Sequence, residues 1–239
     1  MFAGDSDLLR SLAAVTGPSR VPREFVGRAR DLQRRVDGLD AIATVQMADI
    51  VRPAQEWLRR KPNLRAEMLA EIARRWRDEI PAEFRLSFEV KLDGRWGLIT
   101  ERRVGAARMW HDRWQGEHEL AIVLLEQTLI AKPKRTELFE RPVATVSLHA
   151  LGRYFQRTPL ASEAGLLEDL GPLMQHAVSE HERLRQDFTV STPRGVWTGK
   201  LIRTPETPVL ASVLTWIDND AIRDAVATHP HNRPGEASA

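Results

Sequence analysis

Three side chains that could act on a phosphate recur at intervals of four residues: His149, Arg153 and Arg157. In an α-helix, which rises about 1.5 Å per residue, they would project from one side within about 12 Å. An imidazole can take or give a proton at neutral pH, and two guanidinium groups can bind a phosphate and stabilise charge on its oxygens. The spacing therefore offers the groups that metal-free phosphodiester cleavage needs. The alternative is a solvated row whose arginines pair with acids, such as Glu163, Glu168 and Asp169.

The elements predicted around this row follow a definite order. A short strand at 142–146 leads to a helix that Ser147 can cap, and a second helix runs from Ser162 to Arg185 with a kink or break at Gly171-Pro172. Three alternating segments then predict a meander of antiparallel strands. These segments are 188–192, 196–202 and 209–217.

This order, with the helix pattern Ser-x-His-Ala-x-x-Arg-x-x-x-Arg, resembles the small toxin-type ribonucleases of the barnase/EndoU/colicin/RelE superfamily. The segments that carry the resemblance are SLHALGRYFQR at 147–157, FTVSTPRGVWTGKLI at 188–202 and VLASVLTWI at 209–217. In such ribonucleases the helix His and Arg and a hydroxyl residue on a late strand line the cleft. The resemblance therefore implies an active site at His149, Arg153, Arg157 and Thr215.

The mechanism that follows is metal-independent cleavage of RNA. His149 would act as general base or acid on the 2′-hydroxyl or the leaving 5′-oxygen, and Arg153 and Arg157 would neutralise the scissile phosphate. Thr215 or Thr198 would orient the phosphate through its hydroxyl. The reaction would need no metal and no other cofactor.

The N-terminal part of the chain reads as helical. Apolar residues recur at three and four residues between Pro22 and Trp76, with expected breaks at Gly38, near Pro53 and at Lys61-Pro62. These breaks predict three or four helices. The first twenty residues are expected to form a separate arm.

Strand periodicity begins after Pro81. Alternating residues on both sides of Asp93-Gly94 predict a β-hairpin from Phe84 to Arg102. The apolar run Leu120–Ile130 fits a buried strand or a short buried helix, and periodicity does not decide between them. A last helix is expected over 218–227.

The expected fold is α+β, with a helical N-terminal region followed by a β-hairpin and a C-terminal region of helices and an antiparallel meander. The domain boundaries are a helical region at 1–80, an α+β domain at 81–228 that carries the candidate site, and a disordered tail at 229–239. No apolar run approaches the length of a membrane span, and the chain has no cysteine. A cytoplasmic protein with no membrane partner is the simplest interpretation.

The charge is unevenly distributed although the net charge is only +2. Between Arg20 and Arg77 there are 14 Arg or Lys against 8 Asp or Glu. This excess fits either the solvated faces of helices or a surface for RNA or another nucleic acid, to which exposed tryptophans could add stacking. The candidate nucleic-acid-binding residues are Arg59, Arg60, Lys61, Arg74, Arg75, Trp110, Trp114 and Lys200.

Two function classes stay open on the sequence. The first is a ribonuclease or toxin-like effector, restrained by an inhibitory or assembly partner. The second is a non-catalytic module that binds nucleic acid or protein. A further alternative is a Mg²⁺-dependent DNA nuclease, because Glu89 and Lys91 match half of such a site. No preceding strand supplies the Asp that would complete it, and the histidine spacings do not predict a metal centre.

Overall fold

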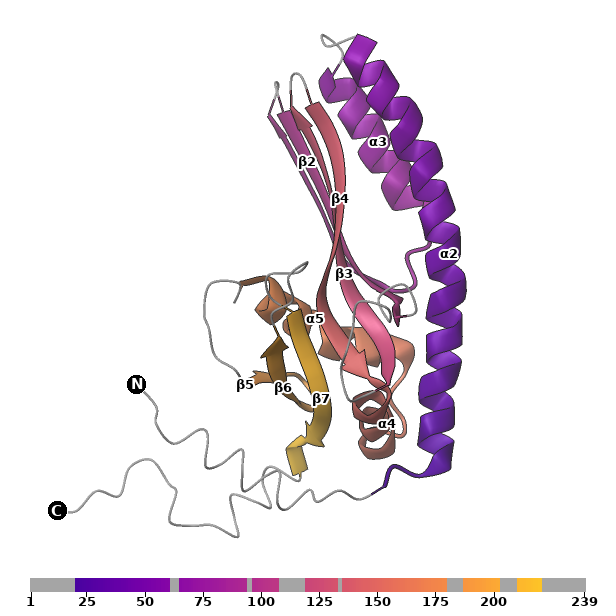
Figure 1. Cartoon of the computed structure of the whole chain (residues 1–239), viewed down its shortest axis with the longest axis vertical. Helices are drawn as coiled ribbons and strands as arrows, with labels where there is room; N and C mark the ends of the chain where they lie inside the picture. The colour runs from indigo at the N-terminus through magenta and orange to yellow at the C-terminus, as the bar shows by residue number, and fades with distance from the viewer. Residues whose placement is uncertain are drawn as a thin grey trace, which may run out of the picture.

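The computed structural model describes residues 20–60, 65–93, 96–107, 119–132, 135–179, 187–202 and 210–220. It confirms the α+β fold, in which helices surround a mixed seven-stranded sheet with the order β1-β2-β3-β4-β7-β6-β5 (Figure 1). The helices are α2 (Arg23–Arg60), α3 (Arg65–Glu79), α4 (Leu148–Arg157) and α5 (Glu163–Ser179). The strands are β1 (Arg85–Asp93), β2 (Trp96–Ala106), β3 (Leu120–Lys132), β4 (Arg135–Ser147), β5 (Asp187–Ser191), β6 (Gly195–Ile202) and β7 (Leu210–Asp218).

Helix α2 is one continuous helix of 38 residues, so the breaks predicted at Gly38 and Pro53 are wrong. Its buried residues recur at helical spacing from end to end, and packing of this stripe outweighs the local cost of a glycine and a proline. The stripe consists of Ala29, Leu32, Val36, Ala43, Met47 and Ile50. The predicted break at Lys61-Pro62 falls outside the described residues.

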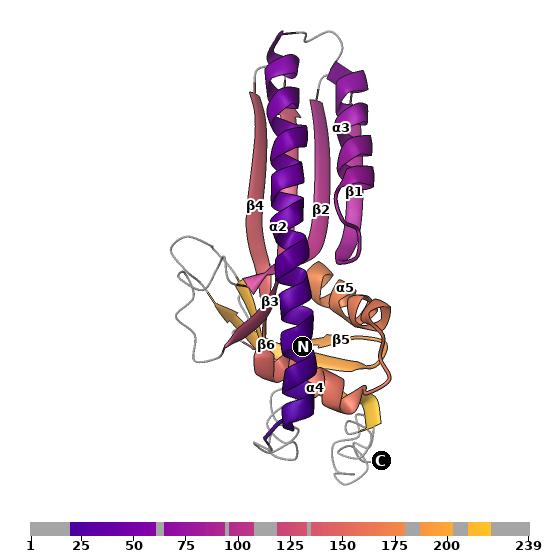
Figure 2. The ribbon, with the colours of Figure 1, turned by 90° about the vertical axis from the view of Figure 1, so that its right-hand side faces the viewer.

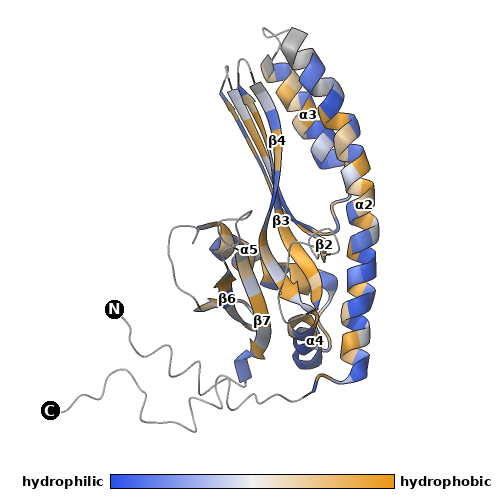
Figure 3. Ribbon diagram, in the orientation of Figure 1, coloured by the Kyte–Doolittle hydropathy of each residue, from blue (hydrophilic) through white to orange (hydrophobic). Residues whose placement is uncertain are grey.

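The strands β1 to β4 form a long antiparallel meander, which Figures 1 and 2 show standing beside α2. The predicted hairpin is confirmed as β1 and β2. The apolar run at 120–130 is a strand, and the lower half of β3 is strongly hydrophobic (Figure 3). Strand β4 begins at Arg135 rather than at Pro142, because its charged first half pairs with β3 in regular register.

The two faces of this sheet are covered at opposite ends. Ile99 and Leu129 pack with residues of α2 and α3 in one hydrophobic cluster. Val104 and Leu124 belong to a second cluster with residues of α4 and α5. Successive side chains of a strand point to opposite faces, so these odd-numbered and even-numbered residues lie on opposite sides of β2 and β3. The part of the even-numbered face near the β1–β2 end is therefore left outside both clusters.

The order β4, α4, α5, β5, β6, β7 confirms the predicted succession of strand, two helices and meander. Strands β4 and β7 pair in parallel over Ala144–Val146. Helix α5 continues through Pro172, so the helix is not broken there. Ala29, Leu32 and Val36 of α2 share a cluster with α4 and α5, which links the predicted 1–80 and 81–228 regions.

Residues 1–19 of the expected arm at 1–20, most of the 218–227 helix and the tail at 229–239 lie outside the described residues. In the described part of the chain, none of the helices has the length and apolar character that crossing a membrane requires.

Candidate functional site

Helix α4 carries the row of basic residues that the sequence singled out. Ser147 caps it as predicted, because the Oγ atom accepts a hydrogen bond from the backbone N–H of Ala150 at 3.1 Å. His149 is exposed in the first turn, whereas Arg153 is only 4% exposed. The imidazole of His149 is therefore exposed to solvent, whereas the side chain of Arg153 is buried in the protein.

The two arginines have different surroundings. Nη1 of Arg153 donates to Oε1 of Gln156 at 3.3 Å, and burial, followed by the charge of Arg157, lowers the pKa of the Arg153 guanidinium. Arg157 donates to Oδ2 of Asp218 at 2.7 Å. Asp218 is a site residue that the sequence did not reveal, because it lies at the end of β7, 61 residues further along the chain.

The structure does not bring Thr215 to this row. Trp197 and Trp216 are opposite each other on β6 and β7, and both rings contact the ring of Tyr154 on α4. Thr198 and Thr215 form the adjacent cross-strand pair, so their side chains point to the other face of the sheet. The predicted convergence of a strand hydroxyl with His149 is therefore wrong, and the reason is the alternation of side chains along β7.

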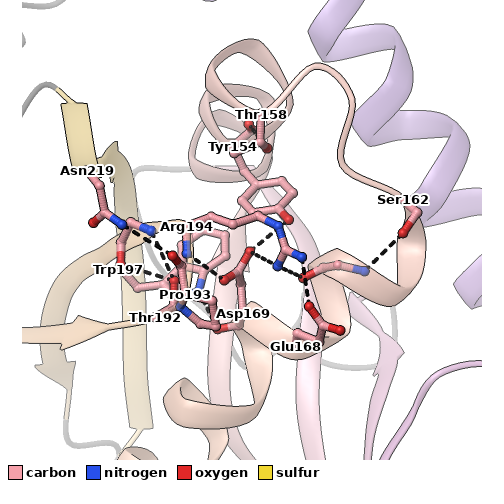
Figure 4. A network of polar contacts seen from close by, with 12 residues as sticks. Tyr154, Thr158, Ser162, Glu168, Asp169, Thr192, Pro193, Arg194, Trp197 and Asn219 are labelled. Atoms are coloured by element: carbon pink, nitrogen blue, oxygen red, sulfur yellow. Dashed lines mark hydrogen bonds and ion pairs between the residues drawn. The ribbon is translucent and has the colours of Figure 1, made fainter.

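The acids that could have paired with the α4 arginines are used elsewhere. Glu163 forms an ion pair with Arg35 of α2, and Glu168 accepts from Arg194 at 2.7 Å. Asp169 is fully buried and accepts from Nη1 of Arg194 at 3.0 Å (Figure 4). The two contacts with Arg194 hold the turn between β5 and β6 against α5.

The candidate nucleic-acid-binding residues do not gather on one described surface. Arg74 forms hydrogen bonds with Glu71 and Arg75 with Glu79, all within α3, as solvated helix faces do. Lys200 is exposed on β6. Lys61, Trp110 and Trp114 and the side chains of Arg59 and Arg60 lie outside the described residues.

Glu89, which with Lys91 matches half of a Mg²⁺-dependent nuclease site, is engaged in a contact with another side chain. Oε1 of Glu89 accepts from Nη1 of Arg102 at 2.7 Å. Across the described ranges, no group of three or more His, Cys, Asp or Glu residues is arranged to hold a metal ion.

A second candidate site is the face of β1 to β4 that turns away from α2 and α3, which we call the outer face. Cross-strand register aligns its residues in rows across the four strands. Trp96 is 41% exposed and Phe139 is 46% exposed, and Leu98 and Ile130 lie half-buried opposite each other between them. One row is Lys91, Leu98, Ile130 and Glu137, and the next is Glu89, Thr100, Thr128 and Phe139.

An ionic ladder borders these apolar residues. Glu126 of β3 accepts from Nε of Arg102 at 2.9 Å and from Nη2 of Arg141 at 2.6 Å. Burial alone would raise the pKa of Glu126, but hydrogen bonds and charge from Arg141 and Arg102 outweigh it and leave that pKa below its ordinary value. The ladder fixes the strands that carry Trp96 and Phe139.

Comparison of the chain with models of protein families, with curated proteins and with solved structures found no match.

Proposed function

We propose that this chain is a cytoplasmic, non-catalytic module that binds a protein partner on the outer face of β1 to β4. The observation that carries the proposal is the exposure of Trp96 and Phe139, at 41% and 46%, on one rigid sheet face. Large aromatic side chains on a fixed surface are the usual anchors of protein interfaces. The hydrogen-bonded ladder that borders them on one side ties β2, β3 and β4 together before a partner arrives, which lowers the entropic cost of binding.

The charges of the outer face favour a protein over a nucleic acid. The described side chains of this face carry no net charge, because four cations balance four acids. The cations are Lys91, Arg102, Lys132 and Arg141, and the acids are Glu89, Asp93, Glu126 and Glu137. Arg102 and Arg141 are already bound to Glu126. A surface for single strands combines stacking aromatics with an excess of positive charge, and the described side chains of this face supply only the aromatics.

Site-specific photo-crosslinking in cells tests the proposal. A photoreactive phenylalanine analogue replaces Trp96 in one variant and Val45 in a control, since Val45 is an apolar residue of α2 that is 63% exposed. We expect a discrete, nuclease-resistant protein adduct from position 96 that the control lacks. Equal adducts from both positions, or none, would contradict a docking surface on the outer face. An adduct that nuclease removes would identify nucleic acid as the ligand.

A second candidate function is metal-independent ribonuclease activity. The observation that favours it is an exposed His149 on a helix that also carries Arg153 and Arg157, within the element order on which the resemblance rests. His149 would transfer the proton, and Arg157 would exchange Asp218 for the substrate phosphate. Thr215 has no part in this version of the site.

Cleavage of mixed cellular RNA in excess EDTA tests the second candidate. The wild type is compared with His149→Ala and with His176→Ala, which removes a histidine of α5 that contacts Phe188 instead. Cleavage by the wild type and His176→Ala that is lost in His149→Ala would establish the ribonuclease. Absence of cleavage by all three proteins would eliminate it.

A further inference from the structure

Strand β4 has a free edge over most of its length. On one side it pairs with β3 along its whole course. On the other side β7 pairs only with Ala144–Val146, so residues 135–143 have no strand partner within the described part of the chain. Figure 2 shows this part of β4 at the margin of the sheet. An open row of backbone N–H and C=O groups is a template for another strand.

We propose that two copies of this chain pair antiparallel through these edges, about a two-fold axis through Phe139. The inference goes beyond the proposed function, because the second copy occupies the β4 edge and leaves the outer face free. Phe139 is the central residue of the free segment 135–143, so this axis pairs the two segments over their whole length, with Pro142 the one position that offers no N–H. It also brings two exposed phenylalanine rings opposite each other, a favourable cross-strand pair.

Symmetry and charge together select this register. Directly opposite residues in an antiparallel pair point to the same face, so a two-fold axis perpendicular to the sheet must place one residue directly opposite its own copy, and the axis is named here after that residue. An axis through residue 137 or 140 would oppose two glutamates, and an axis through 138 would place Phe139 opposite Glu137 of the second copy. The axis through Phe139 instead places Glu137 opposite Arg141 of the second copy, twice. It is the central register without opposed like charges.

The same axis preserves the docking surface. A two-fold axis perpendicular to the sheet keeps both outer faces on one side and the α2 and α3 helices of both copies on the other. The two four-stranded halves then form one continuous outer face that carries both Trp96 side chains. Near the upper end of the edge, Nε2 of Gln55 reaches the carbonyl of Thr136 at 3.4 Å, a long contact that a pairing strand can replace.

Engineered cysteines test the pairing directly, because the chain has none of its own. Phe139→Cys places two thiols opposite each other across the axis. Val90→Cys is the matched control, since Val90 lies on the other edge strand and is 41% exposed. Under mild oxidation we expect Phe139→Cys, and not Val90→Cys, to form a covalent dimer. The wild type should show twice the 27.1 kDa chain mass by light scattering.

A charge-exchange experiment provides a second measurement. Glu137→Arg alone and Arg141→Glu alone each oppose like charges and should lower dimer affinity by about tenfold or more. A mixture of the two variants restores both opposite-charge pairs and should dimerise. A monomeric wild type without a Phe139→Cys crosslink, or a mixture that stays monomeric while both variants are folded, would overturn the inference. A position-96 adduct with a different protein would still support the proposed function.

Discussion

The hydroxyl of Tyr154 on α4 donates to Oδ2 of Asp169 on α5 at 2.9 Å, and both side chains are fully buried. Asp169 also accepts from the backbone N–H of Arg194 at 3.3 Å, and its carbonyl oxygen accepts from Nε1 of Trp197 at 2.9 Å. One buried carboxylate therefore joins both helices to the turn between β5 and β6, as Figure 4 shows. The helix that carries His149 is held by this contact as well as by the ion pair between Arg157 and Asp218.

Alkaline titration should report on this contact, because Tyr154 is the only tyrosine of the chain. Burial, and then the charge of Asp169, raise its pKa well above the ordinary 10.0. The folded protein thus favours the neutral phenol of Tyr154. The contribution of this side chain to the free energy of unfolding is therefore complete below pH 10 and is lost as the pH rises further. Ultraviolet difference spectra should show no tyrosinate until the protein unfolds. A tyrosinate midpoint near 10 in protein that stays folded would contradict this, and Tyr154→Phe identifies the signal.

Removal of Glu101 should destabilise the fold strongly. This fully buried carboxylate accepts from Nε1 of Trp76 at 2.7 Å and from Nε of Arg85 at 2.5 Å, and so ties α3 to β1 and β2. Glu101→Ala leaves the largely buried guanidinium of Arg85 without its acid, which typically costs about 3 kcal/mol or more. Urea unfolding measures the loss. Glu71→Ala, which removes an exposed partner of Arg74, should leave the midpoint unchanged.

The elements predicted correctly from the sequence were those with local signals. The Asp93-Gly94 turn between alternating segments marked the first hairpin, and Ser147 marked the start of α4. The continuity of α2 was missed because Gly38 and Pro53 are local breakers, whereas the packing that overrides them is tertiary. The length of β4 was missed because its first half, Arg135–Arg141, is rich in charge and gains its partners only from β3.

Sequence reasoning can predict only the part of a candidate site that lies on a single helix. The spacing of His149 and Arg157 placed both on one side of α4, which needs only helical geometry. The contact of Arg157 with Asp218 depends on how α4 packs against β7, and the Arg102–Glu126 contact depends on strand register. The outer face could not be predicted from the sequence, because its residues become neighbours only when the four strands pair in this register.

Replacement of two glycines by alanine should change the stability of the protein in opposite directions. Gly38 is exposed inside α2, and a Cβ atom there would meet nothing within 4 Å, so Gly38→Ala should stabilise the protein by about 0.5–1 kcal/mol. At Gly199 a Cβ would lie 2.0 Å from the carbonyl oxygen of Ser212 and 2.7 Å from the Phe188 ring. Gly199→Ala should therefore destabilise β6. Thermal unfolding of both variants checks the pair, and a shift in the same direction would contradict the packing described.

The ionic ladder of the outer face should stabilise the protein only where Glu126 is charged. Arg102 and Arg141 lower the pKa of Glu126 below its ordinary 4.5, so the stabilisation is complete above that pH and is lost as the pH falls through the lower, folded-state value. Glu126→Gln should cost about 1 kcal/mol at neutral pH, because both arginines lose their charged acceptor. Urea unfolding of the two proteins from pH 7 to pH 3 should show this difference shrinking below pH 4.5, since the carboxylate of the unfolded wild type then takes up a proton while the folded carboxylate is still charged. A difference that stays constant or grows in acid would show that the variant acts through packing and that the ladder contributes no charge-dependent stability.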